Sequence, residues 1–332
     1  MPKPMTMELW NLDAADYPAD KTLSDKLDFL LNYAQLAPSS HNSQPWQFSV
    51  QDNEIHIYPD LDHWLKVADP EQRELYISLG CALENLLVAA EHFQLGYQAS
   101  FFSDKEGKAH FASAAFSEDS PTANVRDPNL FDAMLQRRTN REPFQSRLIP
   151  KEELMQIKAA WMEKDLQLHF IANIEQKRQL AIMVQTADET LCANPAYRHE
   201  LADALGQGAF GSRWPWSRLA QLLFRHINLG ARLGKHNAHA LMSAPVLIVL
   251  SAEQDDAISQ IKVGQLYERI ALTATKLGLN TQPLSQILEI PGLRQQLAAM
   301  LPDAKLVPQH FLRLGYPSSL KTHTPRRLIL KM

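Results

Sequence analysis

Two long stretches with apolar residues at helical spacing constrain the fold most, because they match each other at a fixed offset. The first runs from about residue 71 to 93 and the second from about 258 to 277. Each periodicity predicts a helix, and we expect the two helices to pack together at the centre. A shift of 184 positions aligns six identical residues among 22: Ile77 with Ile261, Gly80 with Gly264, Glu84 with Glu268, Ala90 with Ala274, Leu95 with Leu279 and Gln98 with Gln282. This match suggests an internal repeat, although two helices of similar composition can also match by chance.

The charge balance argues against a general polyanion binder. The 332 residues include 33 Lys and Arg and 37 Asp and Glu, which gives a formal net charge of −4, and 45% of them are hydrophobic. At about 150 residues per domain the length corresponds to roughly two domains. Because this bulk charge would attract neither nucleic acid nor an acidic membrane surface, we expect no partner of either kind. Any basic cluster must act locally.

Cysteine usage and the N-terminal sequence predict a cytoplasmic protein. Two cysteines, Cys81 and Cys192, are too few for a disulfide framework or a cysteine-based zinc site. The residues after Lys3 lack the apolar segment of a secretory signal. No apolar run approaches the roughly 18 residues that cross a bilayer.

Local patterns predict a mixed α+β chain. A helix is expected over about 23–36 behind a capping box of Thr22 and Asp25, and Pro38 ends it. Further strands and helices follow from alternation and helical spacing. Expected strands are 46–50 and 54–58, joined by a turn at Asp52–Asn53, then 166–171, 245–250 and 311–314; a helix begins at Asp127–Pro128, and residues 173–232 are mostly helical.

The polar stretch 103–126 predicts a break in the chain. It contains a turn at 103–107 and its best linker candidate is 117–122. We therefore expect two parts, residues 1–122 and 123–332, with a helical insert at about 186–243 in the second part.

Residues 37–46 form the most unusual segment. Pro38 and Pro45 bracket six consecutive polar residues at a junction between a helix and a strand, directly before Trp46. Serine, asparagine and proline are common turn formers, so an ordinary capped loop is one interpretation. The density of small polar groups beside an indole favours a second one, a rigid rim for a flat polar ligand.

Two arginine clusters could build a phosphate site. Three arginines occur in residues 137–141, at the end of a predicted helix, where the helix dipole alone would favour them. The pair Arg326 and Arg327 lies near the C-terminus and could equally be solvated. Together they could bind one phosphate, because planar guanidinium groups hold phosphate oxygens in pairs.

Other motifs are weaker. Residues 206–211 match G-x-G-x-x-G but follow a predicted helix, not a strand, so a dinucleotide site is disfavoured. His236 and His239 lack a third ligand in any known metal spacing, so we expect no metal site. The sequence contains no nucleophile elbow, no Walker loop and no H-E-x-x-H motif.

Four segments carry a resemblance to one family. Residues 37–46 resemble the A-P-S-S-x-N-S-Q-P-W segment of FMN-dependent nitroreductases, and residues 137–141 resemble that family's R-R-S-x-R element. Residues 271–283 are similar to its helix ending in A-x-x-L-G-L and the segment at the flavin edge. Residues 244–249 resemble its A-P-V-x-I-V strand.

The order of these segments is unusual for that family. Ordinary members carry the arginine element before the P-S-S-x-N segment and place their flavins between two chains, whereas here the order is reversed. The chain thus resembles the single-chain, duplicated, Acg-like branch. The resemblance implies an α+β, nitroreductase-like fold with a mainly antiparallel sheet flanked by helices, one chain mimicking the usual dimer. It also implies one complete FMN site, a feasible monomer and a possible homodimer.

The resemblance also assigns residues. Arg137 would contact the FMN phosphate, with Arg326 or Arg327 as a second phosphate ligand. Arg138 and Thr139 would line the ribityl and phosphate region, and Arg141 would stabilise negative charge at the N1–C2=O edge of the reduced ring. The residues that close over the flavin or edge it, some through backbone N–H groups, would be Pro38, Ser39, Ser40, Asn42, Pro283, Leu284 and Ser285.

The implied function is an FMN-dependent NAD(P)H oxidoreductase. NADH or NADPH would pass hydride to FMN, which would reduce a nitroaromatic, a quinone or a similar acceptor, and no side chain need act as a nucleophile. A flavin-binding or storage protein with little turnover is the alternative, if insert aromatics Phe210, Trp214, Trp216 and Phe224 form a lid and do not simply pack a helical core. A ring-cleaving or dehydrogenating flavin enzyme is a third.

Overall fold

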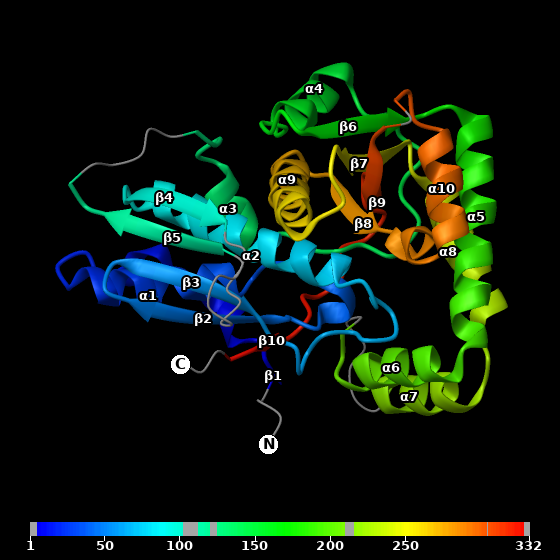
Figure 1. Cartoon of the computed structure of the whole chain (residues 1–332), viewed down its shortest axis with the longest axis horizontal. Helices are drawn as coiled ribbons and strands as arrows, with labels where there is room; N and C mark the ends of the chain where they lie inside the picture. The colour runs from blue at the N-terminus through cyan, green and yellow to red at the C-terminus, as the bar shows by residue number, and fades with distance from the viewer. Residues whose placement is uncertain (1–4, 102–111, 120–124, 210–215, 304, 329–332) are drawn as a thin grey trace.

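The computed structural model describes residues 5–101, 112–119, 125–209, 216–303 and 305–328. It contains two four-stranded antiparallel sheets (Figure 1). The first, in the order β2-β3-β5-β4, consists of β2 (Trp46–Gln51), β3 (Glu54–Pro59), β4 (Gly96–Phe101) and β5 (Ala112–Ser117). The second, in the order β6-β7-β9-β8, consists of β6 (Leu166–Ile171), β7 (Val246–Ala252), β8 (Asn280–Pro283) and β9 (Val307–Gly315). Both sheets follow one path, in which two strands, a long helix and two more strands assemble in the same neighbour order.

The two long helices pack against each other between the sheets, as the sequence predicts. They are α2 (Arg73–His92) and α9 (Ala257–Lys276). A Cβ atom at Gly80 would lie 2.0 Å from the carbonyl oxygen of Ile261, and one at Gly264 would lie 2.0 Å from that of Ile77. The contact is therefore reciprocal at the 184-residue offset. Glycine is required at both positions because the backbones approach too closely for any side chain.

Four helices are inserted between the first two strands of the second sheet. They are α5 (Ile174–Ala193), α6 (Pro195–Gly206), α7 (Trp216–His226) and α8 (Gly230–Ser243). In the first sheet the same connection is the predicted turn at Asp52–Asn53. Helices α5 and α10 (Pro291–Ala299) cover one face of the second sheet, with Val184, Leu247 and Phe311 in the core between them.

Three shorter helices complete the helical layer. Helix α1 (Leu23–Ala34) begins at the expected capping box, in which Thr22 and Asp25 bond each other's backbone N–H groups. Helix α3 (Leu130–Met134) starts three residues after the expected Asp127, and α4 (Lys151–Ala159) precedes the second sheet. The largest apolar core includes Leu27 and Leu30 of α1 together with residues of α2, α9 and both sheets.

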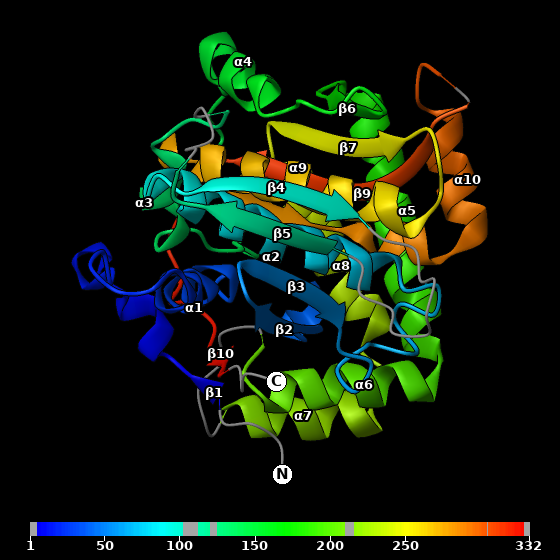
Figure 2. The ribbon, with the colours of Figure 1, turned by 60° about the vertical axis from the view of Figure 1, so that its left-hand side comes forward.

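One expectation was wrong in detail, and one of two alternatives is excluded. Part of the stretch interpreted as polar is strand β5, whose Ala and Ser side chains alternate too weakly in hydropathy to predict a strand. The expected turn at 103–107 and the second half of the linker at 117–122 lie outside the described residues. The C-terminal arginines are not a solvated tail, because β10 (Arg326–Arg327) pairs antiparallel with β1 (Met5–Thr6), the first described strand (Figure 2).

No helix within the described ranges is long and apolar enough to cross a membrane.

Candidate functional site

Two adjoining cavities bring together most of the predicted site residues. The smaller has a volume of about 260 Å³ and the larger about 350 Å³. The residues that line both are Pro38, Ser39, Thr139 and Arg141. The smaller cavity adds Asn42, Arg137, Arg138 and Arg326, and the larger adds Ser40, Pro283, Leu284 and Ser285. Arg327 lines neither cavity, because its guanidinium donates to the carbonyl oxygen of Ser43.

The proline-bracketed segment adopts a strained backbone at the rim. His41, Asn42 and Gln44 have φ angles of 48°, 55° and 50°, in the left-handed region that favours glycine. Hydrogen bonds hold this conformation: the backbone N–H of Gln44 donates to the hydroxyl of Ser39, and the amide of Asn42 donates to the carbonyl of Pro325. Such strain concentrates at binding sites, where surrounding contacts maintain it.

Two buried arginines are among the residues that line the smaller cavity. Arg137 follows α3 and is 4% exposed, and Arg326 of β10 is 1% exposed. Both guanidinium groups donate to the carbonyl oxygen of Leu36, and Arg326 also donates to the side-chain oxygen of Asn42 at 2.8 Å. Nε and Nη1 of Arg137 and Nε of Arg326 have no hydrogen-bond partner among the described residues. Arg138 and Arg141 also line this cavity, and such a concentration of guanidinium groups fits an anion.

A buried carboxyl group lies behind these arginines. Glu268 of α9 is fully buried, and its Oε1 lies 3.4 Å from Nε of Arg137. Burial raises the pKa of Glu268 to about 8, although Arg137 and Arg326 oppose the change. The group is therefore largely uncharged at neutral pH and does not cancel the positive charge of the cavity.

Residues from both chain ends line the remainder of this cavity. Nε of Arg138 donates to Nε2 of His323 at 3.1 Å, and the His323 ring stacks on Trp10 with centroids 3.9 Å apart. Burial and Arg138 lower the pKa of His323 to about 4, so the ring is neutral and can accept this bond. The sequence analysis missed Trp10, Lys321, Thr322, His323 and Thr324. No local motif marks them, because only the pairing of the two termini brings them to the site.

A buried framework positions the arginine element beside the larger cavity. The guanidinium of Arg313, on β9, donates to the carbonyl oxygens of Asn140 and Glu142. Thr139 forms a parallel bridge with Thr281 of β8, next to Pro283. Arg141 therefore lies at the junction of the two cavities. Burial lowers its pKa to about 10, so it keeps its charge at neutral pH.

The helical insert forms the far wall of the larger cavity. Its apolar lining residues are Leu191, Tyr197, Leu201, Leu205, Phe224 and Leu233. Glu200 of α6 accepts hydrogen bonds from the backbone N–H groups of Val67 and Ala68, which attaches the insert to the first half of the chain. Of the four aromatics considered for a lid, Phe224 lines the cavity and Trp216 is 69% exposed; Phe210 and Trp214 lie outside the described residues.

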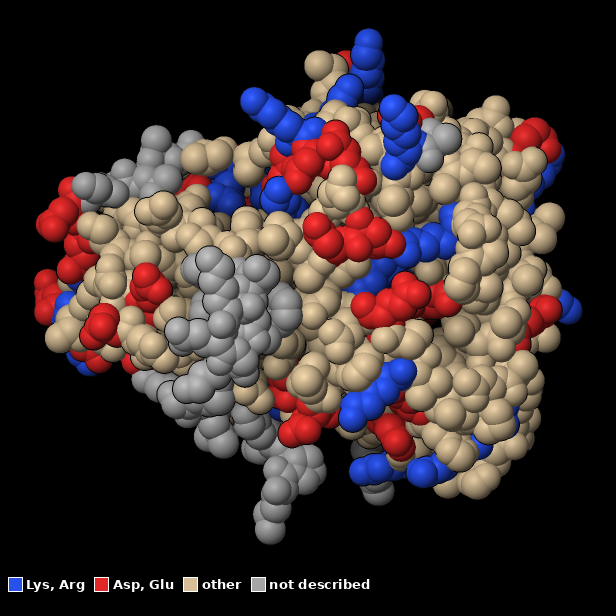
Figure 3. Space-filling view, viewed as in Figure 1, with Lys and Arg blue, Asp and Glu red and all other residues tan. Residues whose placement is uncertain are grey.

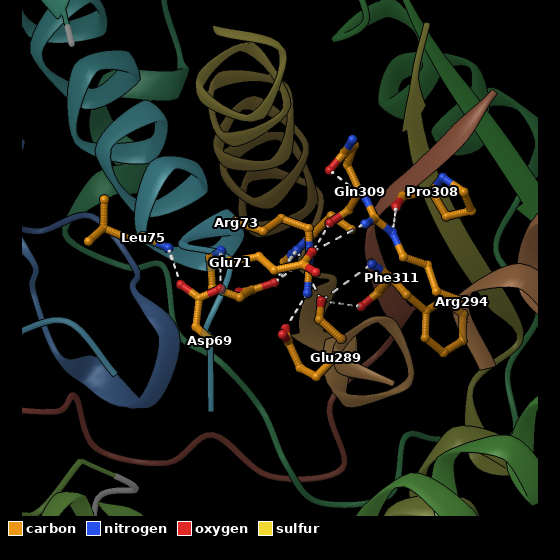
Figure 4. Close-up of polar contacts among 12 residues, drawn as sticks. Asp69, Glu71, Arg73, Leu75, Glu289, Arg294, Pro308, Gln309 and Phe311 are labelled. Carbon is orange, nitrogen blue, oxygen red and sulfur yellow. Dashed lines mark hydrogen bonds and ion pairs between the residues drawn. The ribbon is translucent and has the colours of Figure 1, made fainter. Parts of the chain in front are cut away.

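An ion-pair network supports the floor of the larger cavity (Figure 4). Arg73 is 2% exposed and pairs with Glu74 at 2.8 Å and with Glu289. Asp69 accepts the backbone N–H groups of Glu74 and Leu75 at the start of α2. Burial opposes ionisation of Glu74, but Arg73 and the neighbouring His310 lower its pKa to about 2.

This network joins distant parts of the chain. Glu289 ends the 3₁₀ helix η4 (Ser285–Glu289), so its pairing with Arg73 fastens the segment after Pro283 to the start of α2. Burial raises the pKa of Asp69 to about 7, with Glu74 adding to the effect. Because the partners are more than 200 residues apart, no sequence motif reveals the network.

The weaker motifs do not form sites of their own. Gly206 ends α6, and the last two residues of the glycine motif lie outside the described residues. His236 lines the larger cavity. No group of three or more potential metal ligands occurs among the residues that were searched, namely those with a described position.

Known proteins resemble this chain over most of its length. A protein of Mycobacterium tuberculosis with the provisional name NAD(P)H nitroreductase acg is 26% identical over 326 residues, which cover 94% of this chain and 96% of that protein. Rv3131 of the same organism, also provisionally named an NAD(P)H nitroreductase, is 26% identical and covers 86% of this chain and 84% of its own length.

Solved structures match part of the chain. An iodotyrosine deiodinase bound to FMN and 3-iodo-L-tyrosine is 18% identical, with a TM-score of 0.43, over 61% of this chain and 97% of its own. NfnB of Mycobacterium smegmatis, an FMN-dependent nitroreductase in complex with NADPH, is 16% identical, with a TM-score of 0.40, over 57% of this chain and 88% of its own.

The sequence model of the nitroreductase family matches residues 134–316, a span that contains the arginine element, the whole second sheet and α9. Because this match covers more than half of the 332 residues, the chain belongs to the nitroreductase family.

Proposed function

We propose that this chain is an FMN-dependent NAD(P)H oxidoreductase whose flavin lies across the two adjoining cavities. The observation that carries the proposal is the group of four arginine side chains, Arg137, Arg138, Arg141 and Arg326, that line the smaller cavity. Guanidinium groups hold phosphate oxygens in pairs, so these donors match a terminal phosphate. The relatives named for NAD(P)H nitroreductase activity support the choice of reductant.

The shape and chemistry of the cavities support the orientation of the cofactor. Arg137, Arg326 and Asn42 would hold the phosphate, and Arg138 and Thr139 would line the ribityl chain. The isoalloxazine ring would then lie in the larger cavity, where Pro38, Ser39 and Ser40 form the rim and Pro283, Leu284 and Ser285 line the cavity alongside. A basic cavity next to a more apolar one matches a ligand that has an anionic end and a flat, largely apolar end.

Arg141 would tune the electrostatics of the bound ring. It lies at the junction of both cavities and remains charged at neutral pH. A fixed cation near the pyrimidine edge stabilises negative charge that develops there on reduction. The flavin supplies hydride transfer between NAD(P)H and an acceptor such as a quinone or nitroaromatic. The protein binds and orients the partners and limits access of water.

The shared path of the two sheets supports an internal duplication. The halves cross at the reciprocal glycines Gly80 and Gly264, and the described residues of the two halves contribute different parts of the cavities. A chain of this kind would hold one flavin and could act as a monomer. Two flavins per chain, measured from absorbance and protein concentration after reconstitution, would contradict this part of the proposal.

Two measurements test the function. The purified chain should retain or take up FMN and become yellow, and anaerobic NADPH or NADH should bleach that colour rapidly. A preparation that never binds FMN would overturn the proposal. Steady-state rates with a panel of quinones and nitroaromatics would then identify the acceptor class.

One observation favours a second candidate, a flavin-storage protein with little turnover. The insert lines the larger cavity and is fastened to the first half by Glu200, so it could exclude NAD(P)H from the ring. An oxidised flavin spectrum that persists after anaerobic addition of NADPH and NADH would support storage. Rapid bleaching would support the enzyme.

A further inference from the structure

Helix α7 presents its apolar side outward. Trp216, Leu219, Leu222, Leu223 and Ile227, the last just beyond the helix, are between 40% and 69% exposed. We call these five residues the α7 stripe. Four of them follow the i, i+3, i+7, i+11 spacing of one helix face. A surface helix normally buries such a face, so this arrangement is the reverse of ordinary packing.

The side of α7 that faces α6 mixes polar and apolar residues, and none of them belongs to the stripe. Ser217 is buried, and Gln221 donates to Asp203 of α6 while it accepts from Arg218. Phe224 reaches the larger cavity from this helix. The stripe therefore contributes little to the packing of α7 on α6, and its composition needs another explanation.

The segment of the sequence that carries the stripe is basic. Residues 204–252 contain five Arg and Lys, three His and no Asp or Glu, in a chain whose formal net charge is −4. The acidic residues that precede this segment are engaged: Glu200 accepts from Val67 and Ala68, and Asp203 pairs with Arg225 at 3.7 Å. Helix α7 lies at the lower edge of the molecule (Figure 1), where both basic and acidic side chains are visible (Figure 3).

We propose that the α7 stripe is a docking surface for an anionic phospholipid bilayer. A helix with Trp, Leu and Ile on one side and Arg at its border lies in the membrane interface, where it buries the apolar side and attracts acidic headgroups. The bulk charge of the protein would not produce this attraction, whereas the local acid-free segment does. If two copies paired symmetrically through the stripe, Arg218 and Arg225 of one copy would lie near Arg218 and Arg225 of the other. Repulsion between these like charges disfavours a dimer.

Vesicle flotation of the full-length protein tests the proposal. Vesicles of phosphatidylcholine with one third phosphatidylglycerol should carry the protein at low salt, and pure phosphatidylcholine vesicles should carry much less. The variant Leu219→Gln/Leu223→Gln/Ile227→Gln should lose binding by about tenfold or more, because it replaces three of the five apolar side chains that enter the interface. Melting temperature checks that the variant is folded.

A matched control replaces exposed apolar residues elsewhere. Leu148, Met155 and Ile182 are 83%, 61% and 67% exposed. Their triple replacement by glutamine should leave binding unchanged. A loss of binding as large as that of the stripe variant would overturn the proposal.

A direct probe is Leu219→Cys carrying an environment-sensitive fluorophore, since the native Cys81 and Cys192 are buried and should not react. Its emission should shift to the blue with acidic vesicles. Equal vesicle binding by the native protein and the stripe variant would overturn the proposal. So would a native protein that binds no vesicles and forms a dimer that the stripe variant converts to a monomer.

Discussion

Two glutamates occupy equivalent positions on the crossed helices but lie in opposite environments. Glu84 of α2 and Glu268 of α9 are 184 residues apart, and both are fully buried. Glu84 pairs with Arg126 and with Arg269 at 2.8 Å, and it accepts from Gln265. Glu268 has Arg137 at 3.4 Å and no hydrogen bond to either oxygen within the described structure.

Ionisation differs accordingly. Burial disfavours the charge on both groups, but Arg126 and Arg269 lower the pKa of Glu84 to about 2, whereas that of Glu268 rises to about 8. The comparison shows how one helical position can serve two roles. In the first half Glu84 is fully paired with arginines of the protein itself, whereas in the second half Glu268 lies behind two arginines that line a cavity.

The largest effect should follow from Glu84→Gln. Loss of one charge from a buried ion-pair network leaves Arg126 and Arg269 undercompensated, so the free energy of unfolding should fall by about 3 kcal/mol. Urea denaturation measures it. A change below about 1 kcal/mol would mean that the network is not structural.

The second largest effect should follow from Arg137→Ala, and it concerns FMN binding near Glu268. Loss of charge-assisted hydrogen bonds to phosphate should weaken FMN binding by about 10- to 100-fold. Riboflavin, which lacks the phosphate, should bind both proteins equally well. Isothermal titration with the two flavins separates a phosphate contact from general damage, and equal losses for both would contradict the assignment.

Glu268→Gln should change how the free energy of unfolding depends on pH. A carboxyl group whose pKa is raised in the folded state binds more protons there than in the unfolded chain, so its contribution to stability declines as pH rises from about 4.5 to about 8. The variant should lose this decline and gain stability relative to the native protein toward pH 8. Urea unfolding across this range measures the slope.

The same experiment on Glu84→Gln gives the opposite sign. The pKa of Glu84 is lowered, so its contribution is present above about 4.5 and is lost as pH falls toward 2. Parallel pH profiles for the two variants would show that the two glutamates do not differ.

The smallest effect is expected at the C-terminal arginines. Arg327→Ala should change FMN affinity by less than about threefold, because the Arg327 side chain lies outside both cavities. Arg326→Ala should approach the effect of Arg137→Ala. Equal affinities for the Arg326 and Arg327 variants would show that Arg326 does not bind the phosphate.

Elements with strong local signals were predicted well. Helix α1 has its capping box, β6 has the predicted bounds, and the turn at Asp52–Asn53 joins β2 and β3. Strand β5 was missed because a run of alanine and serine carries little hydrophobic alternation. Its pairing with β3 and β4 stabilises it instead.

In the candidate site too, residues within recognisable motifs were predicted, and residues placed only by tertiary contacts were not. Asn42, Arg137 and Arg326 were expected to meet, since their motifs resemble a known family, and they line one cavity. Sequence alone could not choose between Arg326 and Arg327, because strand pairing with β1 decides which side chain is turned inward. Trp10 and His323 carry no motif.

The amino-acid sequence by itself determined most of the helices, five of the eight strands in the two four-stranded sheets and the chemical character of the two motif segments. It could do so because spacing, capping and side-chain type act over a few residues. The tertiary structure alone decided which of two matching glutamates keeps its charge and which arginine reaches the cavity. Those outcomes depend on burial and on partners tens to hundreds of residues away, and only packing of the two halves brings them together.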